Sequence, residues 1–196
     1  MKKSVLVFLA LYFVSVSATS MTKWKADKSH TMINFTVSHM VISEVTGQFK
    51  DFDATMDAAK EDFTDAKINV TIKAKSIDTG TNSRDYHLRS ADFFNADVDS
   101  IITFNSSKIE KSDTDTYKIY GSLTIRGITK DVILDTKLKG KIKSNKGTVA
   151  AFKATTSITR KEWGLNWNRS MDSGGLLVGE TVDLTILIEF NESKVS

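Results

Sequence analysis

The fold class is decided by residues 181–190, which read TVDLTILIEF. Apolar side chains occupy every second position of this stretch, at Val182, Leu184, Ile186, Ile188 and Phe190. Successive side chains of a β-strand point to opposite faces, so this period of two indicates a segment with one face in an apolar core. The sequence therefore predicts a β-strand here.

The same alternation recurs seven times upstream. It is found within residues 33–37, 45–56, 68–74, 102–106, 117–125, 132–138 and 152–158. In the second of these segments the alternation of apolar and polar residues changes phase near Asp51, which is typical of a β-bulge. Together with residues 181–190, the pattern predicts eight strands.

Short connections with turn-forming residues, such as residues 113–115 and 145–147, favour sequential antiparallel hairpins. One helical segment is predicted between the third and fourth strands, over residues 83–89, with Ser83 as N-cap and Asp85 in the first turn. Closing eight strands into a barrel leaves no exposed edge. We therefore predict an all-β fold, an eight-stranded antiparallel barrel with one short helical segment.

The N-terminal residues have the pattern of an export signal. Lys2 and Lys3 precede an apolar run from Val5 to Val16, and Ala18 follows shortly after it. The run is shorter than the about 20 residues that span a bilayer, so it predicts a signal peptide cleaved after Ala18. We expect a signal peptide over residues 1–18 and a single secreted domain over residues 19–196.

Composition limits the function classes. The chain has 27 basic and 24 acidic residues, and removing Lys2 and Lys3 leaves 25 basic against 24 acidic, a net charge of +1. This balance gives no support to a nucleic-acid partner. The chain has no cysteine, which excludes disulfides and thiol catalysis.

Several small residues fall on the faces predicted to point inward. They are Gly47, Ala54, Ala74, Gly121 and Ala154. Small residues inside a long barrel leave room for an apolar ligand, but they also suit close packing at tight bends. The residues alone leave both interpretations open.

Linked motifs along the chain carry a family resemblance. They are Trp24, Asp27, Ser29 and His30; Phe35, Val37 and His39; Gly47, Phe49 and Phe52; residues 76–80 (SIDTG), 84–85, 87–88 and 90–94 (SADFF); residues 121–125 (GSLTI) and 127–130 (GITK); and Ile158, Arg160, residues 163–164 and 177–179. In this order, over about residues 23 to 190, the sequence resembles the YceI-like family. It departs from the usual family pattern at Ser100, where Pro is usual, and at Trp163, where Phe is commoner.

The resemblance implies an extended lipocalin-like barrel that binds a polyisoprenoid chain, such as an isoprenoid quinone or a prenyl lipid, in a bacterial periplasm. It implies no cofactor besides that bound lipid or quinone. The expected partners are the polyisoprenoid lipid and, transiently, the membrane or a membrane quinone-using protein. A monomer and a homodimer are both compatible with it.

We predict that three groups of residues contact such a ligand. Apolar candidates for the tail are Phe35, Val37, Phe49, Ile72, Phe104, Leu123, Ile125 and Phe152. Aromatic candidates for the rim are Phe93, Phe94, Trp163 and Trp167. Donors for a polar head group are Arg84, His87 and Arg160, since guanidinium groups suit a pyrophosphate and any of the three suits a quinone carbonyl.

Other chemistries have weaker support in the residues. His30, His39 and His87 lack the close spacing of metal ligands, so we expect no metal site, and His30 is expected to pair with Asp27. Ser90, His87 and Asp92 could be assembled into a nucleophilic triad acting on a lipid head group, but helix capping explains the serine and aspartate. We expect a binding or carrier protein and no enzyme; a stress or interaction protein with a filled core is the third hypothesis.

Overall fold

A computed structural model describes residues 20–145, 147–171 and 174–193. The predicted signal peptide, residues 1–18, lies outside the described residues. The strands are β1 (Thr22–Ala26), β2 (Met32–His39), β3 (Ser43–Phe49), β4 (Phe52–Ala58), β5 (Lys67–Lys73), β6 (Ile77–Asp78), β7 (Ile101–Asp113), β8 (Thr116–Ile125), β9 (Ile128–Ser144), β10 (Gly147–Thr159) and β11 (Val178–Glu192). The helical elements are η1 (Ala74–Ser76), α1 (Asn82–Arg89) and η2 (Arg160–Trp163).

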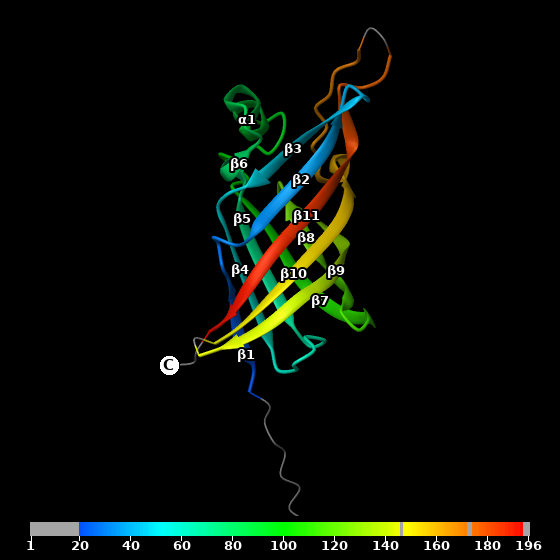
Figure 1. The fold of residues 1–196 in the computed structure, drawn as a ribbon. Helices are drawn as coiled ribbons and strands as arrows, with labels where there is room; N and C mark the ends of the chain where they lie inside the picture. Colours follow the sequence, from blue (N-terminus) through cyan, green and yellow to red (C-terminus); the bar gives the residue numbers. More distant parts are fainter. Residues whose placement is uncertain (1–19, 146, 172–173, 194–196) are drawn as a thin grey trace, which may run out of the picture.

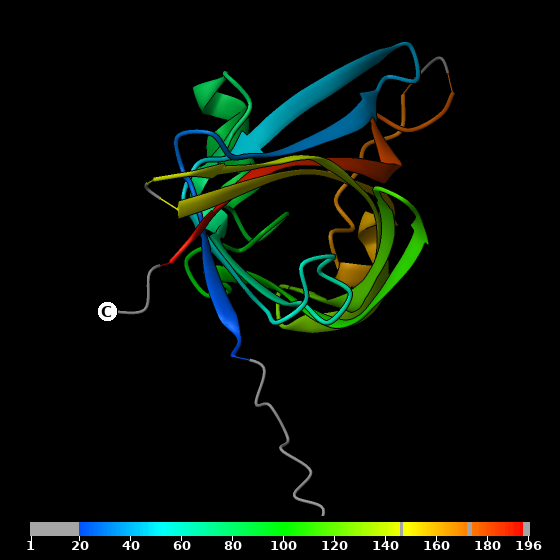
Figure 2. The same ribbon diagram turned by 60° about the horizontal axis from the view of Figure 1, so that its bottom comes forward.

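Eight of the strands close into an antiparallel barrel. The strand order is β1-β4-β5-β7-β8-β9-β10-β11, and β11 pairs with β1 to complete the ring. Figure 2 shows the closed ring of strands turned so that its lower end comes forward. The predicted eight-stranded antiparallel barrel with one short helix is therefore confirmed.

The barrel differs from the prediction in which strands form it. The alternation over residues 45–56 is divided at residues 50–51 into β3 and β4, because the phase change there redirects the chain. Only β4 joins the ring, whereas β3 pairs with β2 and β6 beside it. The ring is completed by β1, which the alternation did not reveal.

Strand β11 is shared between two neighbours, so the sheet forks along it. Its residues 182–187 pair with β2, while residues 190–192 pair with β1. The turn between β1 and β2 sits at this fork, where the Asp27 backbone N–H donates to the Glu189 carbonyl at 2.8 Å. The β2–β3 hairpin consequently projects alongside the barrel (Figure 1).

The two ends of the barrel carry different structural elements. Helix α1 lies at one end, which we call the helix end. The β4–β5 loop, the last residues of β9 and the first residues of β10 lie at the other, the turn end (Figure 1). No helix in the described ranges is both long and apolar enough to cross a membrane.

Helix α1 begins one residue earlier than predicted. Thr81 is its N-cap residue, so Ser83 lies inside the helix and does not cap it. Asp85 is buried and its Oδ1 accepts from the backbone N–H of Thr79 at 2.9 Å and from its hydroxyl at 2.6 Å. The carboxylate thus holds the chain that enters the helix.

Candidate ligand-binding cavity

A cavity occupies the barrel interior. Its wall is built by β2, the β4–β5 loop and every barrel strand except β1. The lining residues are Ile33, Ala54, Met56, Phe63, Ala66, Ile68, Val70, Ile72, Phe104, Ile109, Tyr117, Ile119, Leu123, Val132, Leu134, Thr136, Phe152, Ala154, Thr156, Leu184, Ile186, Ile188 and Phe190. These are the inward positions of the alternating strands, so the strand pattern itself produces the wall.

The cavity is narrow. Its volume is about 130 Å³ although it extends along many strands. A space of that shape suits a slender chain better than a broad ring system. Ligand pockets in proteins are mostly apolar and largely formed in advance, and this cavity has both properties.

The wall has little polar chemistry to offer. None of the described residues that line it is charged, and only Tyr117, Thr136 and Thr156 carry polar side-chain atoms. Acid–base catalysis needs a titratable group near the ordinary pH range, and a metal site needs several donors. The chemistry of the wall therefore matches that of an apolar molecule.

Four of the five small residues predicted to point inward divide into two groups, which resolves the alternatives left open by the sequence. The fifth, Ala74, is buried in η1 within the apolar cluster and does not line the cavity. Ala54 and Ala154 line the cavity and leave room in it. A Cβ atom at Gly47 would collide with the Phe35 ring, and one at Gly121 would collide with the Phe104 ring. The glycines therefore allow close packing of phenylalanine, while the two alanines widen the bore.

Four of the eight predicted tail contacts lie in the cavity wall. They are Ile72, Phe104, Leu123 and Phe152. Phe35, Phe49 and Ile125 instead pack in the apolar cluster at the helix end, where the Phe35 and Phe49 ring centroids are 5.8 Å apart. Val37 lies on β2 beyond the ring and pairs with Val45 and Val182. Phe35, Val37 and Phe49 are displaced from the wall because β2 and β3 leave the barrel, whereas Ile125 is the last residue of the ring strand β8.

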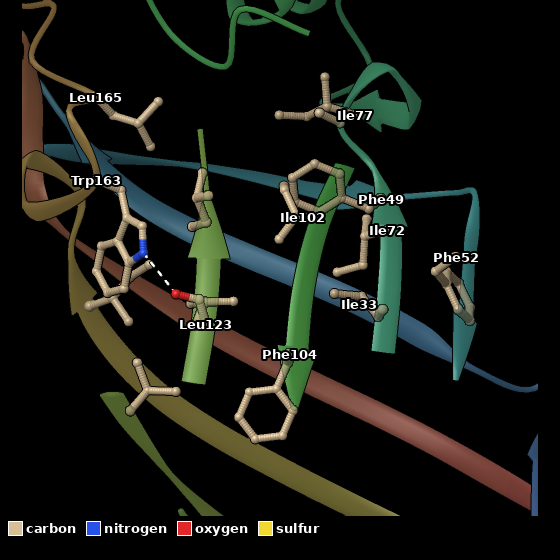
Figure 3. Packing of buried hydrophobic residues seen from close by; sticks show 14 of the residues in the cluster. Ile33, Phe49, Phe52, Ile72, Ile77, Ile102, Phe104, Leu123, Trp163 and Leu165 are labelled. Atoms are coloured by element: carbon tan, nitrogen blue, oxygen red, sulfur yellow. Dashed lines mark hydrogen bonds between the residues drawn. The ribbon is translucent and has the colours of Figure 1, made fainter. Parts of the chain in front are cut away.

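The predicted rim aromatics form a packed layer at the helix end. Trp163 is buried and its Nε1–H donates to the Leu123 carbonyl at 3.1 Å (Figure 3). Trp167 lies 5.2 Å from Phe93, and Phe94 lies 5.7 Å from Phe49, between ring centroids. This layer extends the apolar interior beyond the cavity towards α1.

The predicted head-group donors are not in the cavity wall, and each is bonded to the protein. Arg84 donates to the Thr79 hydroxyl at 2.7 Å and to the Thr79 carbonyl at 3.0 Å. Arg160 is buried and donates to the carbonyls of Gly179 and Leu165, and burial lowers its pKa. It ties together the two ends of the segment between η2 and β11. A role of these donors in ligand binding stays a prediction.

The residues considered for a nucleophilic triad are not arranged as one. The His87 Nε2 lies 2.9 Å from the Asp92 carboxylate, and the His87 ring packs 4.8 Å from the Trp167 ring. The Ser90 hydroxyl donates to the His87 backbone carbonyl at 2.7 Å, which satisfies it without the imidazole. This geometry caps the C-terminus of α1 and activates no nucleophile.

One cluster at the fork of β11 has metal-ligand atoms close together. Single ligand atoms of Asp27, His30 and Glu189 lie within 4.8 Å of one another. The His30 Nδ1 lies 3.1 Å from the Asp27 Oδ2, and this hydrogen bond raises the pKa of His30 and lowers that of Asp27. The predicted His30–Asp27 pair is thus present, and a protonated imidazole would oppose a cation.

Sequence reasoning named only part of the wall. Among the wall residues that it missed are Met56, Tyr117, Ile119, Leu134, Thr136, Leu184, Ile186 and Phe190, all inward positions that the alternation does identify. Phe63 and Ala66 come from the β4–β5 loop, which has no periodic signal. The Phe63 ring packs 5.4 Å from the Phe152 ring at the turn end of the cavity.

Comparison with known proteins places this barrel in a family. Residues 24–190 match the model of the YceI-like domain. UPF0312 protein SERP2314 of Staphylococcus epidermidis is 35% identical over 87% of this chain and 98% of its own. UPF0312 protein SAUSA300_2620 of Staphylococcus aureus is 33% identical over 89% of this chain and 100% of its own.

Solved structures agree with the fold. The YceI protein of Campylobacter jejuni superposes with a TM-score of 0.69 at 33% identity, covering 80% of this chain and 90% of its own. BcnA of Burkholderia cenocepacia has the same fold, with a TM-score of 0.72 at 22% identity over 84% and 98% of the two chains. The family model spans nearly the whole described barrel, and the chain therefore belongs to the YceI-like family.

Proposed function

We propose that this protein is an exported binding or carrier protein that encloses a long isoprenoid lipid in its barrel and performs no chemistry on it. The observation that carries the proposal is the cavity, which is enclosed by strands, narrow, and lined by apolar side chains apart from three hydroxyl-bearing residues. A linear apolar chain has the shape and the chemistry of that space.

Energetics favour such a ligand. Burial of apolar groups contributes about 0.8 kcal/mol per methylene, or roughly 4 kcal/mol for a five-carbon prenyl unit as an upper figure. The 13 residues of β10 extend about 40 Å along their own axis, so several prenyl units would be buried end to end even after barrel tilt. Ordering a flexible chain offsets part of this gain and keeps the affinity moderate.

A structural relative supports the ligand class. A domain from Saccharophagus degradans with the same fold is described as a polyisoprenoid-binding domain implicated in plant cell wall breakdown. It shares a TM-score of 0.63 and 14% identity with this chain, over 87% of this chain and 98% of its own. The likeness supports an isoprenoid chain as the cargo of this fold.

The export part of the proposal rests on residues 1–18. Their two lysines, apolar run and Ala18 have the order of a cleaved signal peptide, which would deliver the barrel to the periplasm. N-terminal sequencing of the protein recovered from its own cells should begin at Thr19. A mature chain that retains Met1 would contradict export by this signal.

Lipid extraction tests the ligand. Organic extraction and mass spectrometry of the protein purified from its native compartment should release about one isoprenoid lipid per chain. Ala154→Phe should abolish this retention, because the added ring fills the bore beside Ala154. Lys153→Phe is the matched control, since the neighbouring Lys153 side chain is exposed, and it should retain the lipid.

Two results would overturn the proposal. One is the absence of stoichiometric isoprenoid lipid both in the native protein and after incubation with long-chain quinones. The other is equal retention by the Ala154→Phe and Lys153→Phe variants, which would place the lipid outside the bore.

A further inference from the structure

We infer that the outer face of β9 and β10 is an interaction surface that docks the barrel on a bilayer containing anionic phospholipids. We call this face the lysine surface, and it is made of Ile133, Lys137 and Ile142 on β9 and Lys153 on β10. The inference deepens the proposed function and rests on it for the reason to dock, because a carrier must meet the membrane that supplies or receives its lipid.

Charge is distributed unevenly along the chain, and the basic excess falls in this hairpin. Residues 136–161 contain eight basic and no acidic side chains, whereas the rest of the chain contains 19 basic and 24 acidic ones. The segment covers the second half of β9, all of β10 and the first residues of η2. A chain with a nearly balanced net charge therefore has one side with a positive excess, and such a side attracts anionic partners.

The register of the sheet places two lysines directly opposite each other. Lys137 on β9 pairs with Lys153 on β10, and both side chains are exposed. Like charges in this position destabilise a sheet. Within the described ranges, neither lysine forms an ion pair with a carboxylate. An anion held between the two ammonium groups would relieve their repulsion.

A groove of about 390 Å³ lies against this lysine pair, and its lining includes Lys137, Lys153, Thr116 and Thr155. Asp135 is the one acidic residue among the described residues that line it, and the Lys118 Nζ lies 2.8 Å from its Oδ1. That carboxylate is thus neutralised within the protein. The ammonium groups of Lys137 and Lys153 and the two threonine hydroxyls are donors that suit the oxygen atoms of a phosphate.

Exposed apolar side chains share this face with the lysines. Ile133 is 45% exposed and lies four residues before Lys137, so the alternation of β9 puts both on one side. Ile142 is 71% exposed and pairs with Val149. Val149 lies four residues before Lys153 on β10, so it shares the side of that lysine. The face is therefore both basic and apolar.

The opposite side of the ring has no such excess. In the strand order, β4 and β5 lie four strands away from β9 and β10. Lysines on that side are matched by carboxylates, since the Lys28 Nζ lies 2.9 Å from Asp53 and the Lys73 Nζ lies 2.7 Å from Asp51. The positive charge that remains available to an external anion is consequently concentrated on the lysine surface.

The mixture of lysine and isoleucine selects a bilayer as the occupant. A lipid–water interface accepts both groups, because lysines meet the phosphates of anionic lipids while apolar side chains enter the boundary of the acyl region. A nucleic acid would match the lysines through its phosphates but would give Ile133 and Ile142 no apolar environment. The partner that fits the whole face is an anionic phospholipid bilayer.

Sedimentation with vesicles tests the docking. Lipid-free protein should bind vesicles of phosphatidylglycerol mixed with phosphatidylcholine, and should bind vesicles of phosphatidylcholine alone much more weakly. Binding to the anionic vesicles should weaken as the salt concentration rises, because salt screens charges at the surface. These two measurements use the unmutated protein and do not depend on the folding of any variant.

The double variant Lys137→Gln with Lys153→Gln should bind anionic vesicles about 25-fold more weakly, since each lysine near such a membrane contributes about fivefold. The matched control is Lys25→Gln with Lys67→Gln. It removes two exposed lysines from β1 and β5 with the same change in net charge, and should leave the binding nearly unchanged.

A pair of exposed isoleucines tests the apolar part. Ile142→Ser should weaken binding to anionic vesicles several-fold, because its side chain would no longer enter the acyl boundary. Ile42 is 87% exposed in the turn between β2 and β3, outside the lysine surface. Ile42→Ser is therefore the matched control and should keep the binding.

Four results would overturn the inference. They are no binding of the unmutated protein to anionic vesicles, equal binding to both kinds of vesicle, binding that does not respond to salt, and equal losses in the two double variants. Failure of the proposed function would look different. Docking changes how often the barrel meets a membrane but not the equilibrium occupancy of its bore, so lipid extraction tests the cargo independently. Vesicle binding by a protein that yields no isoprenoid lipid would contradict the cargo and retain the surface.

Discussion

The two ends of the barrel interior are built from the same strands but are filled differently. Towards the helix end, Phe49, Ile77, Ile125, Ile158 and Trp163 pack as a solid core and do not line the cavity. Towards the turn end, Ala54 and Ala154 leave the bore open between larger aliphatic side chains. Both regions have the same alternation of inward and outward residues. Alternation thus specifies the barrel, and the sizes of the inward residues specify whether it is hollow.

The largest effect that separates the two regions is expected from a matched pair of isoleucines on β8. Ile125 in the solid core and Ile119 in the cavity wall are each 6% exposed. Ile→Ala in a core costs about 2–5 kcal/mol, depending on the cavity left behind. We expect Ile125→Ala to lower the free energy of unfolding by about 4 kcal/mol and Ile119→Ala by about 2 kcal/mol, because Ile119 already faces empty space.

Denaturant unfolding of the lipid-free protein measures both values. Equal losses for the two variants would break the comparison, since they would mean that the wall at Ile119 is packed as tightly as the core at Ile125.

A smaller effect is expected from adding atoms at small residues. A Cβ at Gly121 would lie 2.6 Å from the Asn105 carbonyl oxygen and would collide with the Phe104 ring. Gly121→Ala should therefore destabilise the protein by about 1–3 kcal/mol. Ala154→Val adds methyl groups to empty space and should change the free energy of unfolding by less than about 0.5 kcal/mol.

Thermal or chemical unfolding of the two variants checks this pair. A larger loss for Ala154→Val than for Gly121→Ala would reverse our assignment of open and filled space.

The smallest effect concerns the fork of β11, where the strand changes from pairing with β2 to pairing with β1. The hydrogen bond with His30 lowers the pKa of Asp27 below 3.8, and Asp27 raises the pKa of His30 above 6.5. The lowered Asp27 pKa contributes stability above about pH 4 that is lost on acidification. The raised His30 pKa contributes stability below about pH 6.5 that is lost as the pH rises through the folded-state value.

The difference in stability between the unmutated protein and His30→Gln should therefore be largest near pH 5–6 and should shrink towards pH 9. Because both side chains are at the surface, the effect should be small and should weaken with salt. Melting temperatures of both proteins across this pH range measure it. A constant difference would show that the fork does not depend on this ion pair.

The sequence predicted the barrel well because alternation is a local property. It missed β1, a strand of five residues in which only Trp24 and Ala26 are buried, because so short a segment shows little periodicity. The sequence analysis also joined β3 to β4, because a break between two strands at residues 50–51 and a β-bulge produce the same phase change in the alternation. As a result, the prediction counted β2 among the eight strands of the ring, whereas β2 lies beside it.

The candidate site was predicted less well because it depends on contacts between distant residues. Arg160 seemed available for a head group, but its guanidinium donates hydrogen bonds to the carbonyls of Val178 and Gly179, which lie on β11. Ala54 and Gly121 look alike in the sequence, and only packing separates the residue that makes room from the one that is filled.

The most direct test of a hollow turn end is a crystal structure of the protein loaded with an isoprenoid quinone, compared with one freed of lipid. We predict continuous chain-like density along Ala54 and Ala154, with Phe49 and Trp163 packed as they are without lipid. Density outside the barrel, or a ligand that enters by separating Phe49 from Trp163, would contradict this account.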